Sequence, residues 1–331
     1  LREVPVLEAR NIDAGYGKKI DGIPESMILK DVSVSIERGK TVGIIGESGS
    51  GKSTFARVLA GLLPPVTGTV LLDGKTLAPD LRDRTRDELR KVQFVYQMAD
   101  TALNPRHRIR DILGRPVEFY RDLKGGEKDS QIHNLLEMVE LPAQFSDRYP
   151  HELSGGQKQR VSLARALAAS PEVVLCDEVT SALDTIVGAN VIELLKTLRR
   201  DTGVSFVFIS HDLSTVASFA DEIAVLYAGR VAEQGPTDKV LSPPYHPYTR
   251  LLISSVPEMR TGWLEDTIAS KETITGMSSG VELTDTGCPF FARCPLAIEG
   301  TCYTEAPPRR VDGDSHVIEC HREVDELLGG G

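Results

Sequence analysis

Nine residues near the start of the chain, Gly46 to Thr54, have the types and spacing needed to hold a phosphate group. Their glycines allow a tight turn that points successive backbone N–H groups at an anion. The Lys52 ammonium would reach the terminal phosphates, and the Ser53 hydroxyl would coordinate Mg²⁺. The stretch therefore predicts a nucleotide-binding loop that contains Gly46, Glu47, Ser48, Gly49, Ser50, Gly51, Lys52, Ser53 and Thr54.

The residues on either side of this loop predict a strand followed by a helix. Thr41 to Ile45 is an apolar run that is typical of a buried strand. After the loop, Phe55, Val58 and Leu59 recur at helical spacing. A loop between a strand and a helix N-terminus is the context that a phosphate site requires, and a glycine-rich turn with an incidental lysine is the weaker interpretation.

Polar side chains follow three later strand-like segments. At the first of these positions, Gln97 would contact a metal-bound water. Asp177 would hold the metal through water, and Glu178 would orient or deprotonate the attacking water. His211 would contact the γ-phosphate. Each would be an ordinary strand-end residue by itself, and the phosphate loop upstream favours the catalytic interpretation. The predicted catalytic residues are Lys52, Glu178 and His211, and the predicted magnesium ligands are Ser53, Gln97 and Asp177.

Two further segments suggest contacts with a nucleotide. Tyr16 follows an edge strand, and its ring could stack on adenine, although a surface turn is the alternative. Residues 98–149 have helical periodicity with a flexible break at Gly125-Gly126, and we interpret them as a helical insertion. The insertion leads to Ser154, which with the glycines after it predicts a second anion-binding helix start.

The composition limits the classes of function. The 331 residues include 38 Lys and Arg against 48 Asp and Glu, a net charge of −10, which argues against a general nucleic-acid binder. No apolar run approaches the roughly 18–20 residues of a membrane span, and no signal peptide pattern opens the chain. We expect another subunit to anchor the protein if it works at a membrane. Leu1 and the three final glycines indicate a processed or excised chain, so the native termini stay undetermined.

In this order the motifs resemble those of the ATP-binding cassette (ABC) ATPases over about residues 4–240. The resemblance implies an α/β fold: a RecA-like P-loop NTPase core, an antiparallel β edge subdomain, a helical insertion (98–158) and a small C-terminal lobe (241–331) after a cassette domain (1–240). It also implies ATP hydrolysis to ADP and phosphate. By resemblance, Tyr16 stacks on adenine, Asp184 belongs to the D-loop, and the signature that binds a partner's ATP is Ser154, Gly155, Gly156 and Gln157.

The resemblance further implies the partners. The cassette would pair head to tail with a second, identical or homologous ABC ATPase, at the cytoplasmic face of the plasma membrane. Two transmembrane permease subunits and, indirectly, an extracytoplasmic solute-binding protein would complete an importer, and no nucleic acid is expected. A soluble cassette ATPase in DNA repair or multienzyme assembly is the alternative, and half of a tandem cassette protein is a third possibility. The sequence does not identify the cargo.

Four of the five cysteines lie close together near the end of the chain. In a chain without a secretion signal they favour a thiolate metal site over disulfides, either an iron–sulfur cluster or zinc. The His246 to Thr249 segment and the cysteine contexts resemble the C-terminal extension of oligopeptide/dipeptide importer ATPases, which implies a [4Fe–4S] cluster and, as cargo, short peptides or a related small solute. Residues 261–284 are a polar connector. The predicted cluster ligands are Cys288, Cys294, Cys302 and Cys320.

Overall fold

The computed structural model describes residues 4–256, 286–313 and 315–328, and its centre is a mixed sheet in the order β11-β12-β10-β9-β3-β8-β7-β6. Strands β6, β7, β8, β3 and β9 run parallel to one another, and the pairs β9–β10, β10–β12 and β12–β11 are antiparallel. Strands β3, β7 and β8 are buried throughout, which is why they read as apolar runs. The strands are β3 (Thr41–Ile45), β6 (Val92–Val95), β7 (Val173–Asp177), β8 (Ser205–Ile209), β9 (Glu222–Tyr227), β10 (Arg230–Pro236), β11 (Arg309–Asp312) and β12 (His316–Glu319).

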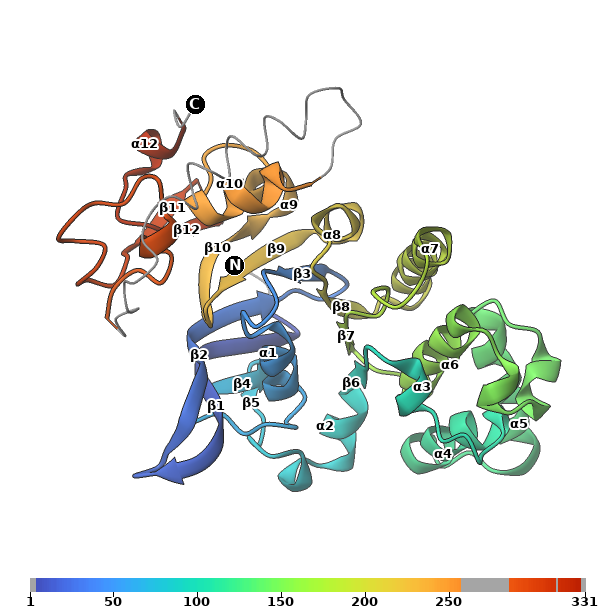
Figure 1. Ribbon diagram of the computed structural model, residues 1–331. Helices are drawn as coiled ribbons and strands as arrows, with labels where there is room; N and C mark the ends of the chain where they lie inside the picture. The colour runs from blue at the N-terminus through green and yellow to red at the C-terminus, as the bar shows by residue number, and fades with distance from the viewer. Residues whose placement is uncertain (1–3, 257–285, 314, 329–331) are drawn as a thin grey trace.

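A smaller antiparallel sheet confirms the predicted edge subdomain. Its order is β2-β1-β4-β5, and Figure 1 shows the β1–β2 hairpin extending away from the body of the protein. Helix α1 lies between this sheet and the large one, because Phe55 belongs to the same buried cluster as Leu7 and Val207. The elements are β1 (Leu7–Ile20), β2 (Ile23–Ile36), α1 (Lys52–Leu59), β4 (Thr67–Leu72) and β5 (Lys75–Thr76).

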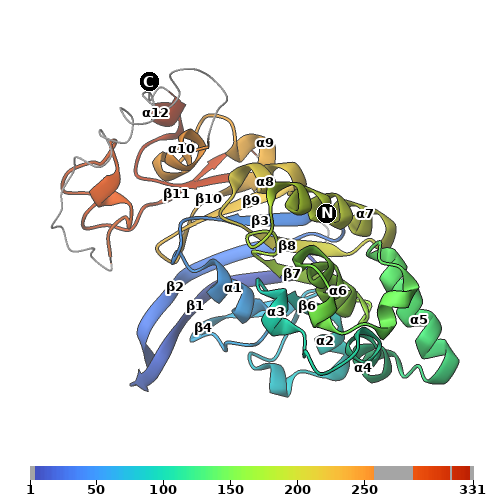
Figure 2. The ribbon, with the colours of Figure 1, turned by 45° about the vertical axis from the view of Figure 1, so that its right-hand side comes forward.

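The predicted helical insertion is present beside β6 (Figures 1 and 2). One detail of the prediction is wrong: Gly125-Gly126 begin helix α5, and the break lies just before them, where Asp122 ends α4 with a φ of 56°. The helices of this part are α3 (Ala99–Ala102), α4 (Ile109–Arg121), α5 (Gly125–Met138), η2 (Ala143–Asp147), η3 (Pro150–Glu152) and α6 (Gly155–Leu167).

The remaining helices pack on the sheets and in the C-terminal segment. They are η1 (Leu81–Asp83), α2 (Arg86–Lys91), α7 (Thr185–Thr202), α8 (Leu213–Phe219), α9 (Thr237–Val240), α10 (Pro247–Ser254), η4 (Phe291–Arg293) and α12 (Val324–Leu328). In the described part of the chain, none of the helices combines the length and apolarity needed to span a bilayer.

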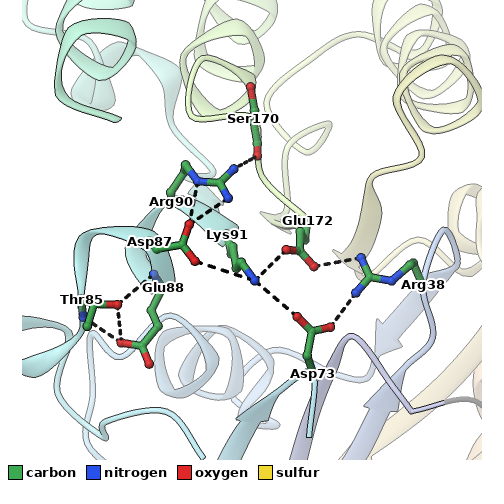
Figure 3. A network of polar contacts seen from close by, with 9 residues as sticks. All are labelled: Arg38, Asp73, Thr85, Asp87, Glu88, Arg90, Lys91, Ser170 and Glu172. Carbon is green, nitrogen blue, oxygen red and sulfur yellow. Dashed lines mark hydrogen bonds and ion pairs between the residues drawn. The ribbon is translucent and has the colours of Figure 1, made fainter. Parts of the chain in front are cut away.

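A network of charged side chains ties together the starts of three strands of the large sheet (Figure 3). Glu172, just before β7, forms ion pairs with Arg38 at 2.8 Å and with Lys91 at 3.0 Å. Lys91 immediately precedes β6 and also pairs with Asp73 in the β4–β5 turn at 3.4 Å. The network therefore joins both sheets at the edge opposite the strand ends that carry the predicted catalytic residues.

The C-terminal segment continues the large sheet. Strand β12 pairs with β10 through Glu233↔Ile318 and Gln234↔Val317. The buried carboxylate of Glu233 lies 2.7 Å from the His316 ring, which fixes the two strands to each other. The predicted connector at 261–284 lies outside the described residues.

Candidate nucleotide site

The phosphate loop has the backbone that its glycines predict. Gly46 has a φ of 150°, and a Cβ there would lie 2.1 Å from the carbonyl oxygen of Leu226. Gly51 caps helix α1 with a φ of 105°. Only glycine fits both positions without strain. The predicted strand, loop and helix are therefore confirmed as β3, residues 46–51 and α1.

The polar groups of the loop are arranged for an anion. The Nζ of Lys52 donates to the carbonyl oxygens of Gly46 and Glu47, each at 2.8 Å, although the side chain is almost fully buried. Burial lowers the pKa of Lys52, and the nearby carboxylates of Glu178, Asp177 and Glu47 oppose that effect. The buried Ser50 hydroxyl has no hydrogen-bond partner among the described residues. An unsatisfied buried hydroxyl and a lysine held only by carbonyls both fit a phosphate ligand.

Ser53 and Asp177 form a second pair at the same edge. The Ser53 hydroxyl donates to Oδ1 of Asp177 at 2.9 Å, and so joins the start of α1 to the end of β7. Burial raises the pKa of Asp177, and the hydrogen bond from Ser53 opposes the rise. A hydroxyl and a carboxylate are the oxygen ligands that Mg²⁺ prefers, so these two residues fit a magnesium ion.

The three other strand-end residues meet around the Glu178 carboxylate. Gln97 Nε2 donates to Oε2 of Glu178 at 2.8 Å, and His211 Nδ1 lies 3.5 Å from Oε1. Gln97 also donates to the Ser181 hydroxyl at 3.2 Å. Glu178 itself has a left-handed φ of 48°, an uncommon backbone for a non-glycine residue. Strained backbone that is held in place by surrounding contacts is typical of functional positions.

Tyr16 borders the phosphate loop. Its hydroxyl accepts a hydrogen bond from Arg57 at 3.0 Å and lies 3.5 Å from the Thr54 hydroxyl. About a third of the residue is exposed, so the ring has a free surface beside α1. This position is compatible with the predicted stacking on adenine, which stays a prediction.

The signature and D-loop residues serve as helix caps. Ser154 and Gln157 form a capping box at the start of α6, and Asp184 caps α7 by accepting from Val187 N at 3.0 Å. A Cβ on Gly156 would lie 2.6 Å from Val187, so glycine permits close packing of α6 against α7. In the described part of the chain, no hydrogen bond joins residues 154–157 to the phosphate loop. The structure therefore leaves these residues outside the group that meets around Ser53 and Glu178.

Sequence reasoning missed the contacts between the phosphate loop and the C-terminal segment, of which the first is made by Tyr248. The backbone N–H of Glu47 donates to the hydroxyl of Tyr248, on α10, at 2.8 Å. Tyr248 is fully buried, and burial raises its pKa. The His246 to Thr249 segment stood out in the sequence only as a family likeness, and nothing in its residue types pointed to the loop.

The four C-terminal cysteines lie in one lobe. Cys288 N donates to the carbonyl oxygen of Cys302 at 2.8 Å, and Ile298 N donates to Sγ of Cys302 at 3.3 Å. Burial raises the pKa of Cys288 to about 11 and that of Cys294 to about 12. Among the described residues, no three His, Cys, Asp or Glu side chains form a group that could hold a metal ion. The predicted metal site is therefore not confirmed.

Comparison with protein families gives two matches. The model of the family described as "ABC transporter" matches residues 29–181, which include the phosphate loop, the insertion and Glu178. The model described as "Oligopeptide/dipeptide transporter, C-terminal region" matches residues 232–302, which include three of the four cysteines.

Comparison with known proteins gives relatives that cover most of the chain. The dipeptide transport ATP-binding protein DppF of Haemophilus influenzae is 39% identical over 292 residues, 88% of each chain. The di/tripeptide transport ATP-binding protein DppF of Pseudomonas aeruginosa is 37% identical over 327 residues, 98% of this chain and 99% of the relative. Among solved structures, the dimeric ATP-binding cassette MJ0796 bound to ADP and Pi is 34% identical with a TM-score of 0.60, and the match covers 70% of this chain and 98% of that one.

Proposed function

The chain belongs to the ATP-binding cassette transporter family, and from this premise we propose that it is the ATPase subunit of an importer for short peptides. It has the P-loop NTPase fold of its structural relatives and hydrolyses ATP. The main support for the proposal lies at the end of β7, where the carboxylates of two successive residues form hydrogen bonds with different partners. Asp177 bonds to Ser53 of the phosphate loop, and Glu178 bonds to Gln97 and lies near His211.

The proposed chemistry follows from these positions. The loop N–H groups and Lys52 hold the phosphates. Ser53 and Asp177, with Gln97 as the third predicted ligand, would hold Mg²⁺, which would neutralise charge on the phosphates. Glu178 accepts a proton from a water as that water attacks the γ-phosphorus, while the bond to the β,γ-bridging oxygen breaks. The products are ADP and phosphate. Gln97 donates to Oε2 of Glu178 and so orients the carboxylate, while His211 lies next to Oε1, on the side where we place the γ-phosphate.

The signature residues support a shared site. Ser154, Gly155, Gly156 and Gln157 open a helix whose N-terminus suits an anion, and among the described residues no hydrogen bond joins them to the phosphate loop of their own chain. We place them against the ATP of a second cassette, identical or homologous, with Asp184 at the junction. Light scattering of the Glu178→Gln variant tests this arrangement, with any cassette protein that co-purifies added to the sample. We expect a dimer in Mg-ATP and a monomer in ADP. A monomer in both nucleotides would contradict it.

The import role rests on the relatives. Those reported above are named as dipeptide and di/tripeptide transport ATP-binding proteins, which favours import of short peptides over DNA repair or multienzyme assembly. We place the subunit at the cytoplasmic face of the membrane, bound to two permease subunits that receive peptide from an external binding protein. Affinity purification from solubilised membranes tests this: co-purification of two integral membrane proteins supports it, and nuclease-sensitive retention on DNA supports the alternative.

A [4Fe–4S] cluster, with zinc as the alternative, is proposed for Cys288, Cys294, Cys302 and Cys320 in the lobe formed by residues 241–331. All four are free thiols within one lobe, and Sγ of Cys302 accepts a hydrogen bond from Ile298 N at 3.3 Å, a contact of the kind that a metal-bound thiolate receives. As they lie among the described residues, the four thiols do not form a group that could hold a metal ion. Iron and sulfide analysis of anaerobically purified protein decides the matter, because a colourless protein with stoichiometric zinc would overturn the cluster.

A further inference from the structure

The part of the chain that carries the four cysteines, described over residues 286–313 and 315–328 and here called the cysteine lobe, contacts the phosphate loop directly. Arg293, in η4, donates from Nη1 to Oε2 and from Nη2 to Oε1 of Glu47, both at 2.9 Å. The two residues are 246 positions apart, and Arg293 immediately precedes Cys294. A bidentate pair of this kind fixes the orientation of both side chains as well as their separation.

Aromatic rings hold the Arg293 guanidinium in place. Tyr227 at the end of β9, Tyr248 on α10 and Phe290 beside η4 pack with ring centroids 4.5–5.5 Å apart. The guanidinium lies 5.8 Å from the Tyr227 ring centroid and 5.7 Å from that of Phe290. We call these three rings the aromatic bridge. Because each ring comes from a different segment, the bridge joins the sheet, α10 and the cysteine lobe.

Glu47 is therefore held at three of its groups. Its carboxylate is bound by Arg293, its N–H donates to the Tyr248 hydroxyl, and its carbonyl oxygen accepts from Lys52 at 2.8 Å. The first two contacts come from the segment after residue 240, beyond the cassette core. Without Arg293, the Glu47 carboxylate would lose its ion pair within the proposed phosphate loop, and a carboxylate there would repel the like charge of a triphosphate.

We propose that Arg293 and Tyr248 are positioning residues of the nucleotide site, and that the C-terminal segment thereby sets the affinity for ATP. Arg293 neutralises and orients Glu47, while Tyr248 fixes the backbone at which the phosphate loop begins. This inference rests on the proposed role of residues 46–54 as the nucleotide loop. The inference concerns nucleotide binding, because among the described hydrogen bonds neither Arg293 nor Tyr248 contacts Glu178 or the two residues around it, Gln97 and His211.

The test measures the Kd for Mg-ATP with a fluorescent ATP analogue, together with KM and kcat. Arg293→Ala is expected to raise Kd and KM about two- to five-fold, the range for a partly exposed ion pair, with kcat within about two-fold. Arg293→Lys should lie between wild type and Arg293→Ala, because lysine keeps the charge and loses the bidentate geometry. Tyr248→Phe keeps the ring, removes the acceptor for Glu47 N–H, and should also raise Kd.

A second substitution separates loop positioning from general damage to the lobe. In the Glu47→Gln background, Arg293→Ala should no longer raise Kd, because there is no carboxylate left to neutralise. Arg310→Ala is the matched control: it removes an Arg–Glu pair of the same lobe, with Glu323 at 2.8 Å, and should leave Kd unchanged.

The outcomes are distinguishable. Wild-type protein that fails to bind ATP would overturn the proposed function itself. Wild-type binding with an unchanged Kd in Arg293→Ala would overturn this inference alone. An equal rise in Arg293→Ala and Arg310→Ala, or a rise that persists in the Glu47→Gln background, would also overturn it, since either result indicates a loss of lobe structure in place of a contact with Glu47.

Discussion

Gln97 holds the Glu178 carboxylate by a 2.8 Å hydrogen bond, and it does so from the boundary between the sheet and the helical insertion. Gln97 follows β6, and α3 begins two residues later at Ala99. Any shift of the insertion relative to the sheet therefore acts on the carboxylate through one side chain. This relationship gives a physical route by which a membrane partner that contacts the insertion would affect hydrolysis.

Gln97→Ala tests that route. Without the amide, the Glu178 carboxylate keeps the longer contact with His211 as its described polar contact. We therefore expect ATP turnover to fall about 3- to 10-fold while KM for ATP changes little, as for loss of an orienting hydrogen bond. Steady-state ATPase assays measure both constants. Gln93→Ala is the control, because Gln93 lies on β6, just before Gln97, and its side-chain amide donates to the Leu89 carbonyl oxygen, away from Glu178. Equal losses in the two variants would contradict the assignment.

Gly46→Ala tests the backbone of the phosphate loop. A methyl group there would meet the Leu226 carbonyl at 2.1 Å, so the main chain must move, and we expect a loss of about 2 kcal/mol or more in the free energy of unfolding. Urea unfolding without nucleotide measures it. Gly49→Ala is the control: its φ of 82° is also left-handed, but no atom lies within 4 Å, so about 1 kcal/mol of backbone strain is expected. A Gly49→Ala loss as large as that of Gly46→Ala would argue against the close contact.

Glu172→Gln tests the charged network at the opposite edge of the sheet. Burial alone would raise the pKa of Glu172, but hydrogen bonds and ion pairs with Lys91 and Arg38 outweigh it and lower the pKa. A lowered carboxyl pKa contributes stability that is present above its ordinary value and is lost as the pH falls through the folded value.

We therefore expect Glu172→Gln to cost about 1 kcal/mol of unfolding free energy at pH 7. This difference should shrink below about pH 4.5, the range in which an unshifted glutamate titrates. Urea unfolding at several pH values measures it. The variant should retain wild-type KM for ATP, because the network lies away from the phosphate loop. A difference that grows as the pH falls would contradict the sign of the shift.

Much of the site could be predicted from the sequence because the fold is built from local signals. A buried strand, a glycine loop and an amphipathic helix identify the phosphate loop without tertiary information. Parallel strands carry their carboxyl ends at one edge, which is why Gln97, Glu178 and His211, each of which follows a strand, lie together in the structure.

The features that the sequence does not predict depend on contacts between segments that are far apart in the chain. Periodicity does not show that Gly125 begins a helix, since glycine can either break or start one. Nor does any spacing rule bring Arg293 to Glu47, because that pair forms only when β12 joins β10 and carries the cysteine lobe toward β9. The cysteine prediction relied on residue type and family likeness, and neither determines where the sulfur atoms lie.

The most direct test of the account is the rate of ATP hydrolysis by the Glu178→Gln variant, with bound nucleotide identified after the reaction. We expect turnover to fall at least about 100-fold, the usual contribution of a general base, with ATP recovered intact on the protein. Lys52→Ala, by contrast, should lose bound nucleotide. Wild-type turnover by Glu178→Gln would contradict the role of Glu178 and, with it, the proposed mechanism.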